Sequence, residues 1–358
     1  MSTTQCSVCG TGFVPRFAFQ VQRTADDVQY FCSQTCHEDH LFAADSRECS
    51  VCSETFRLQF AFQQVQVDGE TRYFCSADCR QAELAEVERR RTSMRRIAVL
   101  NQKGGTGKTT TSVNVAAGLA DLGYRVLLMD LDAQGNVAVS LGLSAQYTLY
   151  HVLVDGQHPT DCIVPVAPNL DAIISNTSLA QAEARLVTAA ERYKVLAQRM
   201  SRITNYDYVI MDCAPSLSVL NQNALTFADH ILIPVSCDYL SLVGVRQVLR
   251  TLKKVNEILL QPVSVLGVVP TFYDKRTKIS AEAMSTLQAY FQDKVFPPIH
   301  VNTRLKEAPS HKKTIFEHDP DGRGAEDYRM LVREIAERCG TTVAPATGKE
   351  SEVGVQHA

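Results

Sequence analysis

Residues 97–110 read IAVLNQKGGTGKTT, which places a short apolar run directly before a glycine-rich loop. The run 97–100 is typical of a strand buried in a parallel sheet, and residues 109–122 continue with apolar side chains at helical spacing. A strand, a glycine-rich loop and a helix in this order gather backbone N–H groups at a helix N-terminus, an arrangement that holds phosphate groups. The stretch therefore predicts a phosphate-binding loop in an α/β domain.

The end of this loop fits the P-loop pattern G-x4-G-K-[ST]. In that pattern Lys108 reaches the β- and γ-phosphates of a nucleotide, and the Thr109 hydroxyl contacts Mg²⁺. The pattern requires a glycine at position 102, where this chain has Gln102, and a second lysine, Lys103, opens the loop. The candidate nucleotide-binding residues are Lys103, Gly104, Gly105, Thr106, Gly107, Lys108, Thr109 and Thr110.

The variant KGGTGKTT at 103–110 is a deviant Walker A motif, and with it the chain resembles the ParA/MinD family of dimerising ATPases. Three later segments are similar to the ParA branch of that family. A DxD segment at 126–136 reads VLLMDLDAQGN, a Walker B strand at 208–216 reads YVIMDCAPS, and 302–310 reads NTRLKEAPS. The resemblance covers 96–340 and implies a doubly wound parallel sheet of the P-loop NTPase kind, which binds and hydrolyses ATP with Mg²⁺.

The resemblance also implies how charge is arranged around the nucleotide. Phosphoryl transfer depends mainly on positioning and on neutralising charge. Lys108 and the loop amides would hold the phosphates, while Thr109 and Asp212 would hold Mg²⁺, Asp212 through water. The signature lysine of the family, here Lys103, would reach across a nucleotide-sandwich dimer to the partner's phosphates. ATP binding and homodimer formation would thereby be coupled.

Two more site residues are carried over from the family. Asp132, the second acid of DxD, matches the residue that positions the attacking water, whereas Asp130 reads as a structural or switch residue. A strand-end aspartate that only caps a helix is the alternative for Asp132. Asn302 matches an adenine contact. The family commonly has Pro-Arg just before it and this chain has His300-Val301, so the detail of base recognition stays open.

Strand-like runs alternate with helical stretches through the rest of this region. Such alternation is the pattern of a doubly wound parallel sheet, in which ligands bind at the carboxyl ends of the strands. Lys108, Asp132 and Asp212 would meet at that edge. We expect strands at 171–174, 208–212, 230–235 and 263–269.

The cysteines are concentrated near the N-terminus, where eight of the twelve lie before residue 80. They form two sets that superimpose at a spacing of 43 residues, each reading C-x2-C-x22-C-x3-C, which is an internal repeat. Two close pairs of thiolates suit tetrahedral zinc, and Ser33 and Ser76 stand where a helix carrying the second pair would begin. The predicted zinc ligands are Cys6, Cys9, Cys32 and Cys36 in one set and Cys49, Cys52, Cys75 and Cys79 in the other.

We expect the zinc ions to be structural, because so short a repeat cannot build its own core and four thiolates leave no open coordination position. His37 and His40 could compete as ligands, but Arg80 and Glu83 replace them in the second repeat, so we expect both on the solvent face of a helix. The ligands and the aromatic residue before the third cysteine resemble FCS/TRASH-like treble-clef zinc fingers. Unpaired spacing predicts buried thiols at Cys162, Cys213, Cys237 and Cys339.

Charge indicates which partners each part can bind. The whole chain has a formal net charge of -3, so contact with DNA must come from a local basic patch. Residues 1–92 contain 9 Arg, no Lys and 13 Asp plus Glu, a balance of -4, and each four-thiolate zinc site adds about -2. Because an acidic module repels phosphates, we expect the zinc repeats to contact a protein; a purely structural role is the alternative.

The sequence predicts five parts. Zinc-binding repeats at 1–43 and 44–83 are followed by a charged linker helix at 84–95, a ParA-like ATPase domain at 96–340 and a disordered tail at 341–358. The basic end of the linker leaves DNA contact open there. No apolar run approaches a transmembrane span and the N-terminus lacks the apolar core of a signal peptide, so we expect a cytoplasmic protein. The resemblance to ParA proteins implies that it associates with the nucleoid.

Three functions compete. The first is a ParA-like ATPase whose ATP dimer binds DNA nonspecifically and positions DNA or protein cargo, stimulated by a centromere-binding or cargo-adaptor protein. The second, a MinD-like membrane ATPase, needs an amphipathic C-terminal helix, and the tail is polar. The third, an iron–sulfur carrier ATPase, needs cluster-spaced cysteines in the ATPase domain. The predicted DNA contacts, for which a solvated basic surface is the alternative, are Arg246, Arg250, Lys254 and Arg276.

Overall fold

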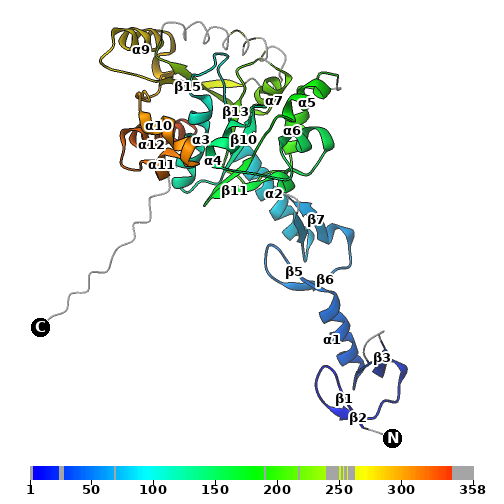
Figure 1. The fold of residues 1–358 in the computed structure, drawn as a ribbon. Helices are drawn as coiled ribbons and strands as arrows, with labels where there is room; N and C mark the ends of the chain where they lie inside the picture. The colour runs from blue at the N-terminus through cyan, green and yellow to red at the C-terminus, as the bar shows by residue number, and fades with distance from the viewer. Residues whose placement is uncertain are drawn as a thin grey trace, which may run out of the picture. The chain divides into compact units, whose positions relative to one another are not determined.

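The structure is a computed structural model that describes residues 3–23, 28–67, 70–188, 191–216, 218–238, 250, 253, 256 and 263–340. The chain divides into two compact units, Met1–Arg89 and Arg90–Ala358. Figure 1 shows the helices and strands of both. Within the described ranges, no helix combines the length and the apolar character that a bilayer span requires.

Both cysteine repeats of the first unit fold in the same order. A short hairpin carries the first cysteine pair, a 3₁₀ turn and a second hairpin follow, and a helix begins after the third cysteine. The first repeat contains β1 (Thr4–Gln5), β2 (Gly12–Phe13), η1 (Ala18–Gln20), β3 (Val21–Arg23), β4 (Val28–Tyr30) and α1 (Gln34–Asp45). The second contains β5 (Ser46–Glu48), β6 (Thr55–Arg57), η2 (Ala61–Gln63), β7 (Gln64–Val67), β8 (Glu70–Tyr73) and α2 (Ala77–Ser93).

A serine caps each of these helices at the expected place. The Ser33 hydroxyl accepts a hydrogen bond from the Cys36 N–H at 3.2 Å, and the Ser76 hydroxyl accepts one from the Cys79 N–H at 3.2 Å. Each cap fixes the first helical turn, and with it the fourth cysteine of the repeat.

The small core of the first repeat is built around Phe31, which is fully buried. The rings of His37 and His40 pack on Phe31 with centroid distances of 4.9 and 5.1 Å. Both histidines are half-buried, so the expectation that they face solvent is wrong. Three residues apart on α1, they lie on one side of the helix and share one aromatic ring.

A seven-stranded sheet in the order β11-β12-β10-β13-β9-β14-β15 forms the frame of the second unit. All described strands of this sheet run parallel except β11, which pairs antiparallel with β12 at one edge. The doubly wound parallel sheet is therefore confirmed. The strands are β9 (Arg95–Val99), β10 (Val126–Leu131), β11 (Val164–Ala167), β12 (Leu170–Ile173), β13 (Tyr208–Cys213), β14 (His230–Ser236) and β15 (Ser264–Thr271).

Helices cover both faces of this sheet (Figure 1). On one face α3 (Lys108–Asp121) and α12 (Arg323–Arg338) belong to a core that includes Val115, Leu128 and Leu331. On the other face lie α5 (Leu179–Leu186), α6 (Val195–Met200) and α7 (Val219–Phe227), whose apolar residues join a second core. Because both faces are covered, every residue of β10 and β13 is buried.

The remaining elements, most of them short, connect the strands or follow the last strand of the sheet. They are α4 (Asn136–Leu141), the π-helical turn η3 (His151–Asp155), the 3₁₀ turns η4 (Pro159–Cys162), η5 (Gln292–Lys294) and η6 (Ala308–His311), and the helices α9 (Lys278–Phe291), α10 (Thr303–Glu307) and α11 (Ile315–His318). The four cysteines of this unit are buried, as expected: Cys162, Cys213, Cys237 and Cys339.

Candidate functional site

The glycine-rich loop turns tightly between β9 and α3. Gly107 directly precedes α3 with φ of +82°, a left-handed conformation that a residue with a Cβ adopts only with strain. The Lys108 ammonium donates to the Lys103 carbonyl at 3.0 Å, and the buried Thr271 hydroxyl donates to the Thr106 carbonyl at 2.9 Å. The loop carbonyls of Lys103 and Thr106 thus have donors within the protein. The N–H groups in the first turn of α3 have no partner further along the helix, and such a helix N-terminus is where an anion binds best.

Asp212 lies near the end of β13, beside the first turn of α3. Its carboxylate accepts hydrogen bonds from the Thr109 hydroxyl at 2.7 Å and from the Ser112 hydroxyl at 3.0 Å. Burial raises the pKa of Asp212 to about 6, against the two hydroxyl donors. Burial also lowers the pKa of Lys108, against the charge of Asp212. Carboxylate and hydroxyl oxygens are ligands that Mg²⁺ prefers, so Thr109 and Asp212 fit that ion.

The DxD segment ends the neighbouring strand, β10. Asp130 is buried, faces Asp212 across the β10–β13 register, and accepts hydrogen bonds from the N–H groups of Asp132 at 3.0 Å and Val137 at 3.2 Å. Burial and the negative charge of Asp212 raise the pKa of Asp130 to about 8. Asp130 therefore holds the turn that carries Asp132 and does not itself reach the cavity in front of the loop.

That cavity has a volume of about 650 Å³. Lys108, Thr109 and Asp132 line it together with the loop glycines, and segments near 214–220 and 305–313 close its other sides. Most of the predicted phosphate and catalytic residues therefore share one cavity, with Asp212 buried behind Thr109. Other lining residues, which no sequence motif marks, include Glu183, Ser218 and Lys313.

Lys103, which the resemblance assigns to a partner's nucleotide, is paired within its own chain. Its ammonium lies 2.7 and 2.9 Å from the two carboxylate oxygens of Asp238. The two side chains are 31% and 44% exposed. Asp238 follows β14, the neighbour of β9, so the pair ties the start of the loop to the adjacent strand. No motif marks Asp238; its place just beyond a strand end is the one signal that could have suggested it.

Asn302 lines a second cavity of about 330 Å³, which shares Gly107 and Thr110 with the first. The Asn302 side-chain oxygen accepts a hydrogen bond from the Arg304 N–H at 2.7 Å and caps α10. Apolar and aromatic residues form much of the wall of this second cavity, including Phe272, Ile299, Leu305 and Tyr328. A largely apolar cavity beside the phosphate loop suits a nucleotide base.

His300, which departs from the family pattern, also lines this second cavity and is held in one orientation. Its Nε2 lies 2.8 Å from Nη2 of Arg323, and its Nδ1 lies 3.0 Å from an Asp327 oxygen. A guanidinium only donates, so Nε2 accepts and Nδ1 carries the proton that it donates to Asp327. The imidazole is thereby fixed at the wall of the second cavity.

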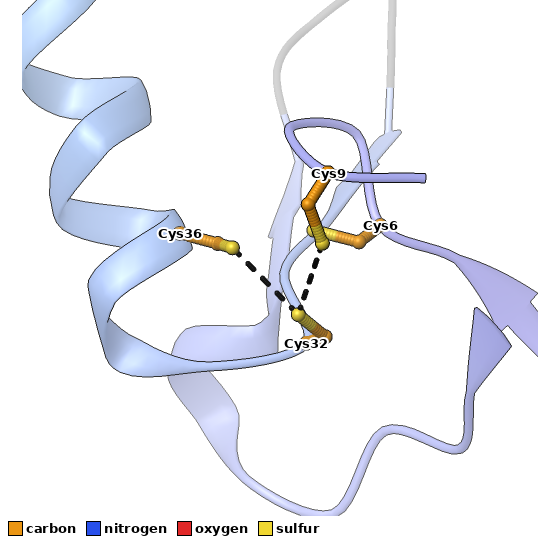
Figure 2. A group of neighbouring side chains, drawn as sticks. All are labelled: Cys6, Cys9, Cys32 and Cys36. Atoms are coloured by element: carbon orange, nitrogen blue, oxygen red, sulfur yellow. Dashed lines mark hydrogen bonds between the residues drawn. The ribbon is translucent and has the colours of Figure 1, made fainter. Parts of the chain in front are cut away.

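Each cysteine set forms a compact cluster. The four sulfur atoms of each set lie within 4.8 Å of one another. In the first repeat, Cys32 Sγ lies 3.4 Å from Cys9 Sγ and 3.7 Å from Cys36 Sγ. Figure 2 shows that the four cysteine side chains of this repeat point toward one another. The corresponding distances in the second repeat are 3.5 and 3.7 Å. Zn–S bonds of ~2.3 Å in a tetrahedron separate the sulfurs by about 3.8 Å, so both clusters fit zinc.

Backbone donors favour the thiolate form of the first cysteine in each cluster. Burial works against ionisation of Cys6, but N–H groups around it outweigh burial and lower the pKa of Cys6 to about 6, and Cys49 behaves in the same way. The neighbouring sulfur of Cys9 raises the pKa of Cys32 to about 12. The raised pKa reflects repulsion between two neighbouring negative sulfur atoms, and a divalent cation between the sulfurs would remove this repulsion.

The predicted DNA contacts are only partly within the described residues. Arg246 and Lys254 lie outside them, and Arg250 is exposed. The Arg276 side chain is 82% exposed, and its guanidinium donates to both oxygens of Asp274 at 2.9 and 2.8 Å. These bonds hold the pKa of Asp274 down at about 2, so Asp274 offsets part of the charge of Arg276 near neutral pH.

These features define a P-loop nucleoside triphosphatase. The sheet is doubly wound, the loop brings a lysine to a helix N-terminus, and the aspartate at a strand end accepts a hydrogen bond from the threonine after that lysine. The family described as "AAA domain" matches residues 94–265. The sporulation initiation inhibitor protein Soj of Bacillus subtilis (strain 168) is 44% identical over 246 residues, which is 67% of this chain and 97% of Soj. The chromosome-partitioning ATPase Soj of Thermus thermophilus is 42% identical over 256 residues, 69% of this chain and 98% of that protein.

Among solved structures, cobyrinic acid a,c-diamide synthase from Mycobacterium smegmatis with bound ATP analog and magnesium is 33% identical. It matches 67% of this chain and 93% of its own with a TM-score of 0.58. The chain belongs to the ParA/MinD family of P-loop ATPases. Similarity over nearly the full length of the Soj proteins places it on the ParA side of that family. It is an ATPase, as the resemblance implied.

Proposed function

We propose that this ATPase forms an ATP-dependent homodimer that binds DNA nonspecifically and partitions or positions DNA or protein cargo. The observation that carries the proposal is the different placement of the two loop lysines. Lys108 lines the phosphate cavity, whereas Lys103 lies at the loop opening and its partly exposed amine is paired with Asp238. A cation placed there can turn to a second protomer's phosphates once the pair opens, so ATP would join two protomers.

Within one protomer, each site residue then has a defined role. Lys108 and the loop amides hold the phosphates, and the Asp132 carboxylate at the cavity wall orients the attacking water. Thr109 and Asp212 hold Mg²⁺, which when bound neutralises phosphate charge. Asn302, in the second cavity, contacts the adenine.

DNA binding is assigned to the basic patch of Arg246, Arg250, Lys254 and Arg276. With a net charge of -3, one chain offers little general attraction for DNA, and a dimer doubles the local patch. The protein would then work in the cytoplasm, on the nucleoid. A MinD-like membrane function has less support, because the tail 341–358 is polar in sequence and a similar protein is named for chromosome partitioning.

The repeats at 1–43 and 44–83 are assigned one structural zinc each, and the linker 84–95 joins them to the ATPase domain at 96–340. Their acidic balance favours a protein partner, such as a centromere-binding or cargo-adaptor protein that stimulates the ATPase.

Retention of a random-sequence DNA duplex with ATP or ADP, in the presence of Mg²⁺, tests this function. Wild-type protein should retain DNA with ATP and release it with ADP. Asp132→Ala should bind ATP, hydrolyse it slowly and retain DNA longest, whereas the exposed control Asp155→Ala should behave as wild type. Equal retention with ADP and ATP would contradict the proposal.

A further inference from the structure

The two cysteine repeats show which residues the duplication has retained. Most of the retained residues have a folding role. Examples are the four cysteines of each copy and the fully buried Phe31 and Phe74. One retained aromatic residue is mostly exposed instead: Phe17 is 64% exposed and its counterpart Phe60 is 60% exposed. The residue directly before it differs, Arg16 in one copy and Gln59 in the other. Folding alone does not require an aromatic side chain that is mostly in water.

A buried glutamine holds each exposed ring in place. The Gln20 side-chain oxygen accepts a hydrogen bond from the Phe17 N–H at 3.0 Å, and its amide group donates to the Cys32 carbonyl at 3.1 Å. Gln63 makes the equivalent two bonds in the second repeat, at 2.9 and 3.4 Å. The ring position is thus tied to the third cysteine of each repeat.

Each exposed ring also stacks on a second phenylalanine. The centroids of Phe17 and Phe19 are 5.9 Å apart with an interplanar angle of 9°, and those of Phe60 and Phe62 are 5.7 Å apart with 10°. The stack braces the ring and leaves more than half of its side chain accessible. In the second repeat the ring borders an open hollow of about 330 Å³, lined by Leu58, Gln59, Phe60, Ala61, Gln64 and Gln66.

An edge strand and the charge of the repeats indicate what fits here. β7 contributes Gln64 and Gln66 to the hollow and, within the described residues, pairs only with β8. Its outer edge can therefore accept an extended peptide as an additional strand. The balance of -4 over residues 1–92 favours a peptide with basic residues over a nucleic acid, whose phosphates it would repel.

We propose that each zinc repeat docks an extended segment of a protein partner, in which an apolar side chain packs on Phe17 or Phe60 and Lys or Arg residues complement the net negative charge of the repeats. This inference rests on the proposed function, because it requires zinc-loaded repeats that contact a protein. Two exposed rings on one chain would let a partner with two such segments bind more tightly than either segment alone.

Selection of a phage-displayed random dodecapeptide library on the full-length, zinc-loaded protein tests the proposal. Enriched peptides should carry an aromatic or aliphatic residue beside Lys or Arg. Their binding, measured by fluorescence anisotropy, should weaken about tenfold or more in Phe17→Ser with Phe60→Ser. The matched control is Val8→Ser with Val51→Ser, since both valines are 43% exposed in the same repeats and lie outside the hollow. The control should bind as wild type.

Several results would overturn the docking surface: enriched peptides without basic residues, equal losses in the valine and phenylalanine variants, or binding of a labelled oligo-dT that the phenylalanine variant loses. Zinc content of every sample separates this inference from the proposed function. If wild-type protein holds no zinc, the docking surface falls together with the zinc assignment of the proposed function. If zinc-loaded phenylalanine variants bind peptide as strongly as wild type, only the docking surface falls. If Phe17→Ser with Phe60→Ser loses zinc, the peptide is varied instead of the protein. Replacing the apolar residue of the peptide by alanine should then weaken its binding to wild-type protein about tenfold, and unchanged binding would contradict the proposal.

Discussion

Lys103 and Asp238 form an ion pair that joins the start of the phosphate loop to the end of β14. The pair links the signature lysine of the family to a carboxylate that no motif marks. If Lys103 acts on a partner's phosphates, this pair must open before the dimer forms. The free energy of opening is then part of the free energy of dimerisation.

Asp238→Asn should therefore strengthen the ATP-dependent dimer. A partly exposed ion pair contributes ~0.2–1 kcal/mol and two such pairs open in each dimer, so the dimer dissociation constant should fall by at most about thirtyfold. Sedimentation velocity over a range of protein concentrations with ATP and Mg²⁺ measures it. Glu191→Gln removes an exposed pair with Lys194 and serves as the control. A weaker dimer in Asp238→Asn would show that Asp238 supports the assembled state instead.

Metal analysis should find about two zinc ions per chain, one for each cluster of four sulfurs. Cys32→Ser should lose one of them, because three thiolates leave the first site incomplete, while ATP hydrolysis is kept since the ATPase site belongs to the other unit. Loss of both ions, or loss of ATPase activity, would contradict independent sites.

Arg276→Glu should weaken DNA retention without lowering basal ATPase activity, and removal of each phosphate interaction should reduce the salt slope by about 1. Asp274→Asn should act in the opposite direction, because it removes the carboxylate that offsets Arg276. The pKa of Asp274 is about 2, so the carboxylate stays charged down to that pH and a shift from pH 7 to pH 5 should not reproduce the variant. Arg250→Glu with Lys254→Glu should also weaken retention. Arg202→Glu, an exposed change elsewhere, is the control.

Deleting residues 1–92 should preserve ATP hydrolysis and DNA binding and abolish cargo positioning in cells, since the acidic repeats are assigned to a protein partner. Fluorescence microscopy of labelled cargo measures the result. Normal positioning by the truncated protein would exclude an adaptor role, and loss of DNA binding would place a DNA contact in the repeats or in the basic end of α2.

The parallel strands could be predicted because their residues are apolar on both faces, as in 208–213 and 230–236, and helices cover both faces. β11 (Val164–Ala167) could not, because it is short and contains Pro165, a residue typical of sheet edges. The orientation of His37 and His40 was also missed. Both tolerate solvent, and only the folded repeat shows that they share the ring of Phe31.

The site was predictable where a motif places residues next to a strand end, as for Lys108, Asp132 and Asp212. The partners of these residues were not. Asp238 is 135 residues from Lys103, and Ser112 is 100 residues from Asp212. Such pairs depend on which strands lie side by side, here β14 beside β9 and β13 beside β9, and no local pattern carries that order.

The coupling of ATP to dimerisation through Lys103 is tested most directly by comparing Lys103→Ala with Lys108→Ala. ATP affinity by calorimetry and mass by sedimentation velocity should be measured on the same samples. Lys108→Ala should lose ATP binding and dimerisation together, because it removes the main phosphate charge of the cavity. Lys103→Ala should bind ATP with Mg²⁺ nearly as wild type does and remain monomeric, because its contact is made to the partner. ATP-dependent dimers of Lys103→Ala as stable as those of wild type would contradict the coupling.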